Sequence, residues 1–232
     1  MAELTLVLLH SPLVGPLTWA ATAECLRREG LPTAVPTLVL DGDPPYYRRV
    51  ADSTAAAVAT IGTPLVLVAH SAAGAFLPPI AEAIGNRVRA MIFVDALLPH
   101  PGLSSLDSAP PQAAKMLTDE AGDGYLPPWH TWFPPGLIEE LLPDPDLRHR
   151  FIAEIAPPPL AYFEEPAPET PGLPETQCAY LQLSQAYEGA ADEAERRHWL
   201  VHRVNADHLT MLTNPEAIAE LIGEITKTLI RD

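Results

Sequence analysis

Short runs of apolar residues alternate with longer amphipathic stretches along most of the chain. Unbroken Val, Leu and Ile runs are typical of parallel strands buried on both faces, and amphipathic stretches between them are typical of crossover helices. We therefore expect an α/β protein with a mostly parallel, open sheet flanked by helices. The strands are expected at 4–9, 33–35, 65–69, 88–94, 179–183 and 200–204, and the helices at about 19–29, 46–61, 74–84, 189–198 and 215–230.

Proline interrupts this pattern over one long segment. Seventeen of the 27 prolines lie between residues 99 and 174, a density that breaks long helices and central strands. The same segment holds seven of the 15 aromatic residues, whereas disordered linkers are poor in aromatics. We therefore expect residues 99–175 to form a helical, proline-rich cap inserted between two parts of one core, residues 1–98 and 176–232.

The charge balance is strongly acidic, with 30 Asp and Glu against 14 Lys and Arg and a net charge of −16. Such a chain repels phosphate backbones and anionic lipid heads, so we expect neither nucleic acid nor a membrane as a partner. No apolar stretch approaches the roughly 20 residues of a membrane helix, and no basic residue precedes the first apolar run as in a signal peptide. These features predict a cytoplasmic protein. Cys25 and Cys178 are too few for a four-ligand metal site and are expected to be buried thiols.

The candidate chemistry begins at the end of the third predicted strand. Residues 65–69 run directly into His70-Ser71-Ala72-Ala73-Gly74 and then into a helix. A serine at the apex of a strand–turn–helix unit is typical of a nucleophile elbow, with alanine here at the two positions that usually carry glycine. The alternative is that Ser71 only caps the helix.

Two further regions carry groups that a nucleophilic serine needs. His208 follows the last predicted strand and could serve as its base, or it could be an ordinary surface histidine. The backbone N–H of Ala72 would bind an oxyanion together with a second donor from the loop after the first strand. That second donor is either Ser11 or Leu13, since Pro12 between them has no N–H. His10 is a candidate substrate contact, although a histidine that braces this loop fits the pattern better.

These segments together resemble the α/β-hydrolase-fold proteins, in particular the small capped esterase and hydroxynitrile-lyase-like group. The resemblance covers residues 4–95 and 177–231 and rests on segments that occur in family order. They are His10-Ser11-Pro12 with Trp19, His70-Ser71-Ala72-Ala73-Gly74, Phe93-Val94-Asp95-Ala96, and Asp207-His208-Leu209 with Asn214-Pro215-Glu216. The segment 99–175 is similar to the family's cap in position only.

The resemblance implies a triad acid, and its position is open. The family usually carries it after the penultimate strand, where Glu188 is the nearest acid in this chain. Asp95 ends the preceding strand, an alternative position in this fold, and keeps the order Ser, Asp, His. We favour Asp95, and Glu188, Asp192 and Asp207 remain alternatives.

We therefore expect a serine hydrolase that cleaves a small neutral or apolar ester, lactone or thioester through an acyl-enzyme, without cofactor or metal. The cap aromatics are candidate substrate contacts, although some must simply pack: Trp129, Trp132, Phe133, Tyr162 and Phe163. The resemblance leaves two alternatives, a cofactor-free lyase or cyclase that uses the same Ser-His pair, and a slow-turnover ligand-binding homologue. The partner is expected to be a small molecule, and the sequence does not decide between monomer and homodimer.

Overall fold

A parallel sheet forms the centre of the molecule. The computed structural model describes residues 4–169 and 177–230. Within them lies a six-stranded sheet in the order β2-β1-β3-β4-β5-β6, in which every neighbouring pair is parallel. The strands are β1 (Thr5–Leu9), β2 (Thr33–Ala34), β3 (Leu65–Ser71), β4 (Val88–Ala96), β5 (Gln177–Gln182) and β6 (Leu200–Arg203). The prediction of an α/β fold with an open parallel sheet is confirmed.

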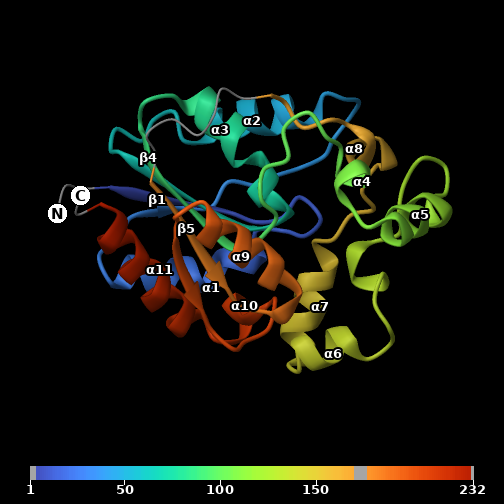
Figure 1. Cartoon of the computed structure of the whole chain (residues 1–232). Coiled ribbons are helices and arrows are strands. Elements are labelled where there is room, and N and C mark those ends of the chain that lie inside the picture. The colour runs from blue at the N-terminus through green and yellow to red at the C-terminus, as the bar shows by residue number, and fades with distance from the viewer. Residues whose placement is uncertain (1–3, 170–176, 231–232) are drawn as a thin grey trace.

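Both faces of the sheet are buried under helices. Successive side chains of a strand point to opposite faces, so Leu6 and Leu8 of β1 enter one apolar cluster and Val7 and Leu9 enter another. Helices α1 (Leu17–Arg28) and α11 (Pro215–Leu229) cover the first face, and α2 (Tyr46–Ala57) and α3 (Leu77–Ile84) cover the second (Figure 1). Helix α9 (Glu188–Arg196) also packs on the second face, since its Ala191 and Ala194 belong to the same apolar cluster. Burial on both faces explains why the strands read as unbroken apolar runs.

The helices occur where the sequence predicts them, with differences at their ends. The helix expected over 74–84 is preceded by a 3₁₀ helix, Ala72–Phe76, and α3 begins only at Leu77. Pro78 and Pro79 fit the first turn of α3 because the N–H groups there have no intrahelical partner. The helix expected over 46–61 ends at Ala57. Among the described helices, none is both long enough and apolar enough to cross a membrane.

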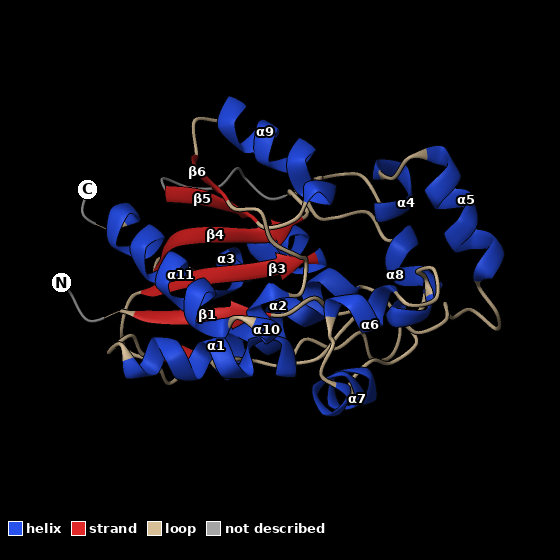
Figure 2. Cartoon of the chain, turned by 90° about the horizontal axis from the view of Figure 1, so that it is seen from below, coloured by secondary structure: helices blue, strands red, loops and turns tan. Residues whose placement is uncertain are grey.

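The segment between β4 and β5 folds into short helices that lie beyond the carboxyl ends of the strands (Figure 2). Proline or a residue beside it begins several of them, and none exceeds ten residues in the described part of the segment. They are α4 (Ser105–Ser108), α5 (Pro111–Glu120), a 3₁₀ helix (Trp129–Thr131), α6 (Leu137–Leu141), α7 (Pro145–Ala153) and α8 (Leu160–Glu164). We call residues 99–169 the insertion. The expected boundary at 175/176 lies outside the described residues.

Two carboxylates of the insertion bind the amino-terminal ends of core helices. Glu165 Oε2 accepts a hydrogen bond from the N–H of Tyr46 at 2.6 Å, and its Oε1 accepts one from Tyr47 at 3.1 Å, at the start of α2. Glu154 accepts one from the N–H of Leu17 at 2.8 Å, at the start of α1. The first N–H groups of a helix lack intrahelical partners and carry partial positive charge, so an acidic side chain satisfies them well. These contacts fasten the insertion to the helices on opposite faces of the sheet.

We expect Glu165→Ala to lower the free energy of unfolding by about 1–2 kcal/mol, because two helix-terminal N–H groups lose a charged acceptor. Glu164→Ala is the matched control, since Glu164 is the exposed neighbour on the same helix end, and a change there should stay within about 0.5 kcal/mol. Urea unfolding of both variants measures the difference. Equal stability of the two variants would contradict the assigned role of Glu165.

Candidate active site

Ser71 occupies a strained position at a strand-to-helix turn. It is the last residue of β3, and the 3₁₀ helix begins at the next residue. Its backbone has φ 58° and ψ −130°, a conformation that non-glycine residues rarely adopt and that needs support from its surroundings. A strained serine at such a turn is the geometry of a nucleophile elbow.

A close backbone contact explains the glycine at position 74. A Cβ atom on Gly74 would lie 2.0 Å from the carbonyl oxygen of Leu97, so no larger residue fits without moving the backbone. The N–H of Leu97 also donates to the carbonyl of Ser71 at 3.0 Å. The chain leaving β4 therefore passes directly against the elbow.

Asp95 is the extra residue of a β-bulge at the end of β4. His70 pairs with Val94, but the next residue, Ser71, pairs with Ala96, so Asp95 has no partner on β3. Asp95 has φ 44°, and a short polar side chain tolerates this region better than most. Bulges redirect side chains at the ends of strands. This one turns the carboxylate of Asp95 toward the loops that follow β5 and β6.

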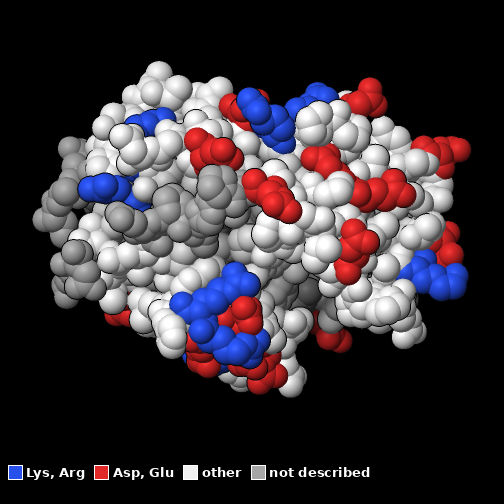
Figure 3. All heavy atoms as spheres, turned by 45° about the horizontal axis from the view of Figure 1, so that its top comes forward, with Lys and Arg blue, Asp and Glu red and all other residues white. Residues whose placement is uncertain are grey.

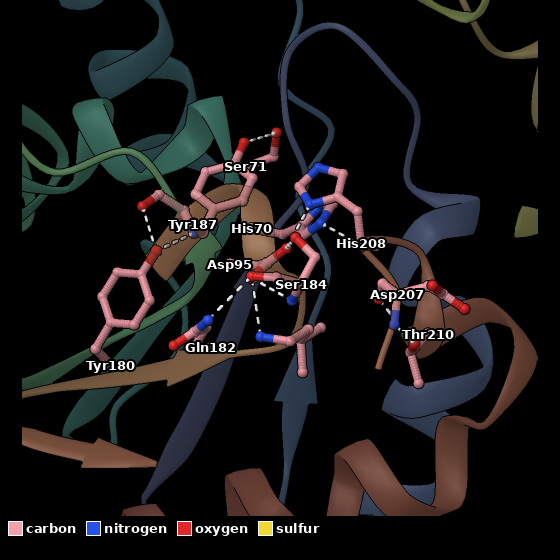
Figure 4. A network of polar contacts seen from close by, with 12 residues as sticks. His70, Ser71, Asp95, Tyr180, Gln182, Ser184, Tyr187, Asp207, His208 and Thr210 are labelled. Carbon is pink, nitrogen blue, oxygen red and sulfur yellow. Dashed lines mark hydrogen bonds and ion pairs between the residues drawn. The ribbon is translucent and has the colours of Figure 1, made fainter. Parts of the chain in front are cut away.

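The carboxylate of Asp95 is fully buried and fully hydrogen-bonded (Figure 4). Oδ1 accepts from the N–H groups of Leu183 at 2.8 Å and Ser184 at 2.9 Å. Oδ2 accepts from the hydroxyl of Ser184 at 2.6 Å and from Nδ1 of His208 at 2.8 Å. Burial alone would raise the pKa of Asp95, but the hydrogen bonds from His208 and Ser184 outweigh it and hold the pKa below its ordinary value. Asp95 is therefore ionised at neutral pH.

His208 lies in the loop after β6, enclosed by other rings. Its side chain is 15% exposed. The ring of Tyr187 stacks on it in parallel at a centroid distance of 5.0 Å, and the ring of His70 lies at 4.4 Å. Trp129 of the insertion lies at 6.3 Å. Because Nδ1 donates to Asp95, the tautomer is fixed and Nε2 is left as the basic nitrogen.

His70 supports the loop that carries His208 through a hydrogen bond to its backbone. Its Nε2 donates to the backbone carbonyl of His208 at 2.9 Å, while its Nδ1 is buried and has no hydrogen-bond partner among the described residues. Burial is the main cause that holds the pKa of His70 well below its ordinary value, and the nearby His208 is the second cause. His70 is therefore a neutral ring that fixes the backbone of the catalytic candidate beside it.

The loop after β1 is held by hydrogen bonds within the loop and to the chain before α2. His10 donates from Nδ1 to the carbonyl of Ser11 at 2.7 Å, and its Nε2 accepts from the N–H of Leu38 at 3.0 Å. Both ring nitrogens of this fully buried residue are thus engaged, so His10 braces the loop and is not placed to contact a substrate. The N–H of Leu13 donates to the hydroxyl of Ser11 at 3.2 Å. Ala72 opens the 3₁₀ helix, so its N–H precedes the first intrahelical hydrogen bond.

The aromatic residues of the insertion divide into two groups. Trp129 reaches His208 and packs edge-on against Phe133 at 4.8 Å. Tyr162 is fully buried and packs on Phe76 of the core at 5.8 Å. Phe163 lies against Tyr162 at 4.8 Å and against Trp132 at 5.9 Å. Trp129 and Phe133 thus lie on the His208 side, whereas Tyr162 attaches the insertion to the core.

The other acidic candidates lie elsewhere. Glu188 is exposed at the start of α9, and Asp207 is exposed in the His208 loop. Asp192 forms an ion pair with Arg203 at 2.8 Å. Ser184 lies two residues after β5, in the region where the resemblance implies the acid, and it donates to Asp95. Of the carboxylates in the described ranges, Asp95 is the one hydrogen-bonded to His208.

Tyr187 is a site residue that the sequence did not predict. Its hydroxyl lies 3.3 Å from the hydroxyl of Ser71, and among the described residues Ser71 makes no hydrogen bond to the ring of His208. A tyrosine after a strand belongs to no motif, so no pattern in the sequence indicates it.

Cys25 and Cys178 are both buried. Within the described residues, no group of three or more His, Cys, Asp or Glu side chains is arranged to hold a metal ion.

A parallel α/β sheet with a serine elbow and a buried carboxylate–histidine pair at the same sheet edge defines the α/β-hydrolase class of proteins. The profile of the alpha/beta hydrolase family matches residues 6–221, and the chain belongs to this family. No curated protein sequence gives a significant match.

Solved structures share the fold at low sequence identity. An extracellular α/β-hydrolase from a Paenibacillus species, described as homologous to tobacco salicylic acid binding protein 2, is 20% identical with a TM-score of 0.76, covering 96% of this chain and 98% of its own. Tomato methylketone synthase I, as an H243A variant with β-ketoheptanoate, is 15% identical with a TM-score of 0.72, covering 99% and 100%. A pyrethroid hydrolase from Sphingobium faniae JZ-2 is 19% identical with a TM-score of 0.70, covering 97% and 98%.

We expect the fold to lose stability as the pH falls below about 6.5. The pKa values of His10 and His70 are both lowered, chiefly by burial, so below this pH the unfolded chain binds protons that the folded chain excludes. Between pH 7.5 and pH 5.5, His70 alone should remove on the order of 1 kcal/mol from the free energy of unfolding. Urea unfolding at both pH values measures this loss. A His70→Gln variant that keeps the full loss would contradict the assignment.

Proposed function

We propose that the protein is a serine hydrolase that cleaves small neutral or apolar esters, lactones or thioesters through an acyl-enzyme. The observation that supports this most strongly is the hydrogen bond between the buried Asp95 carboxylate and Nδ1 of His208, at the sheet edge where Ser71 occupies its strained turn. Membership of the alpha/beta hydrolase family supports the same reaction class.

In this mechanism Ser71 is the nucleophile and His208 the base. Nε2 of His208 takes the proton of Ser71 as Oγ attacks the acyl carbon, and it then passes that proton to the leaving group. Asp95 keeps His208 in the tautomer with a free Nε2 and stabilises the imidazolium that forms. Water, activated by His208, releases the acyl group and regenerates Ser71.

The oxyanion of the tetrahedral intermediate needs donors aimed at it. The N–H of Ala72 is the first candidate because it opens the 3₁₀ helix beside Ser71. The loop after β1 would supply the second, from the hydroxyl of Ser11 or the N–H of Leu13, which in the free protein are hydrogen-bonded to each other. A substrate oxygen would compete with this internal contact.

The insertion would act as a cap that selects the substrate. Trp129 and Phe133 bring apolar surface to the His208 side of the site. On the face that Figure 3 shows, acidic side chains outnumber basic ones over the insertion, and residues 99–174 carry 12 acids against three bases. An apolar wall under an acidic exterior favours neutral acyl groups over anionic substrates.

A fluorophosphonate probe tests the acyl-enzyme mechanism. The Oγ of Ser71 should attack phosphorus and expel fluoride, giving a stable adduct at that serine. We expect Ser71→Ala to abolish labelling, as detected by mass spectrometry of the intact chain. If the folded wild-type protein takes no label, the acyl-enzyme mechanism is wrong, and the lyase, cyclase or ligand-binding alternatives replace it.

The choice of acid is tested by comparing Asp95→Asn with Glu188→Gln. Loss of the carboxylate beside His208 should lower the labelling rate by about 10³- to 10⁴-fold, because the imidazole is no longer held in the correct tautomer. Glu188→Gln should leave the rate within about twofold, since exposed substitutions have small effects. The reverse outcome would assign the acid to Glu188.

A further inference from the structure

Tyr187 contacts both reacting groups of the proposed site. It ends the 3₁₀ helix Gln185–Tyr187 that follows β5, directly before α9. Its hydroxyl lies 3.3 Å from the hydroxyl of Ser71, and its ring stacks on His208 with an angle of 4° between the planes. Figure 4 shows its hydroxyl beside that of Ser71. No other tyrosine in the described residues is hydrogen-bonded to the serine.

The direction of this hydrogen bond matters for the chemistry. Burial raises the pKa of Tyr187 to about 12, so the phenol keeps its proton at neutral pH. A phenol is more acidic than an aliphatic alcohol and is therefore the better donor of the two. With Tyr187 donating and Ser71 Oγ accepting, the proton of Ser71 itself remains available to His208.

We propose that Tyr187 is a further catalytic residue, whose hydroxyl donates a hydrogen bond to the Oγ of Ser71 while that oxygen carries developing negative charge. This inference rests on the proposed serine-hydrolase function. Charge develops on Oγ twice, and hydrogen bonds to a charged acceptor are stronger than those to a neutral one.

In the first step the proton of Ser71 passes to Nε2 of His208 and Oγ forms a bond to the acyl carbon. The bond from that carbon to the leaving group then breaks, and His208 passes the proton to the leaving group. In the second step water adds to the acyl carbon and gives a proton to His208. The bond from carbon to Oγ then breaks with its electron pair on Oγ, which takes from His208 the proton that came from water. Tyr187 keeps its own proton throughout, so it stabilises the serine oxygen in both steps without being consumed.

Tyr187→Phe separates the hydroxyl from the ring. Phenylalanine keeps the ring that stacks on His208 and removes only the donor to Ser71. Since one hydrogen bond to a developing charge is lost, we expect the second-order rate of fluorophosphonate labelling to fall by about 10- to 100-fold. Tyr125→Phe is the matched control, because it removes a phenol from an exposed residue of the insertion, and its rate should stay within about twofold of wild type.

Replacement of Tyr187 by 3-fluorotyrosine tests the donor role in the opposite direction. Fluorine makes the phenol more acidic and hence a stronger donor, and the pKa of about 12 leaves it protonated at pH 7. We expect this variant to label faster than wild type. It also decides the matter if Tyr187→Phe does not fold, which circular dichroism and the thermal midpoint reveal.

The outcomes separate this inference from the proposed function. A wild type that labels at Ser71, with a Tyr187→Phe variant of equal rate or a fluorotyrosine variant that is no faster, overturns the role of Tyr187 alone. A folded wild type that takes no label overturns the serine-hydrolase function and this inference with it. A merely structural role would change the thermal midpoint but leave the labelling rate of the folded variants unchanged.

Discussion

A single buried carboxylate holds together the edge of the sheet on which the site is built. Asp95, at the end of β4, accepts hydrogen bonds from Leu183 and Ser184 after β5 and from His208 after β6. An ionised carboxylate without such partners would be costly in this interior, because burial opposes charge. Few arrangements of the loops after β5 and β6 bring all these donors to the carboxylate, so the carboxylate determines where each loop lies.

The candidate acid, Asp95, lies at the end of β4, whereas the resemblance implies an acid after β5. In this chain Ser184 lies in the loop after β5. Ser184 still takes part in the site, since its hydroxyl and N–H both donate to the carboxylate of Asp95, which comes from β4. The carboxylate thus comes from β4 and one of its hydroxyl donors comes from the loop after β5, and the carboxylate contacts Nδ1 of His208. Triads are defined by geometry and roles, and not by sequence position.

The sequence predicts the parts of this molecule that follow local rules. The strands, the flanking helices and the elbow at Ser71 are visible because apolar periodicity and a strand–turn–helix unit are local patterns. No local pattern indicates Tyr187, because its contact with Ser71 joins two residues that lie more than a hundred positions apart in the chain. Trp129 and Tyr162 look alike as cap aromatics, and only packing shows that the first lies beside His208 and the second on Phe76.

Because of the bulge at Asp95, counting along β4 does not predict the direction in which its carboxylate points. Met91 and Phe93 pack on the same face of the sheet, and strict alternation would place residue 95 there as well. Ala96 joins that face instead, because the bulge adds one residue and shifts the alternation after it. Tyr180 holds this shifted end, since its hydroxyl accepts from the N–H of Ala96 and donates to the carbonyl of Ala96. The left-handed residues at the ends of β3 and β4, Ser71 and Asp95, therefore lie at the same shift in register, and the irregularity that disrupts the sheet is what turns the carboxylate toward His208.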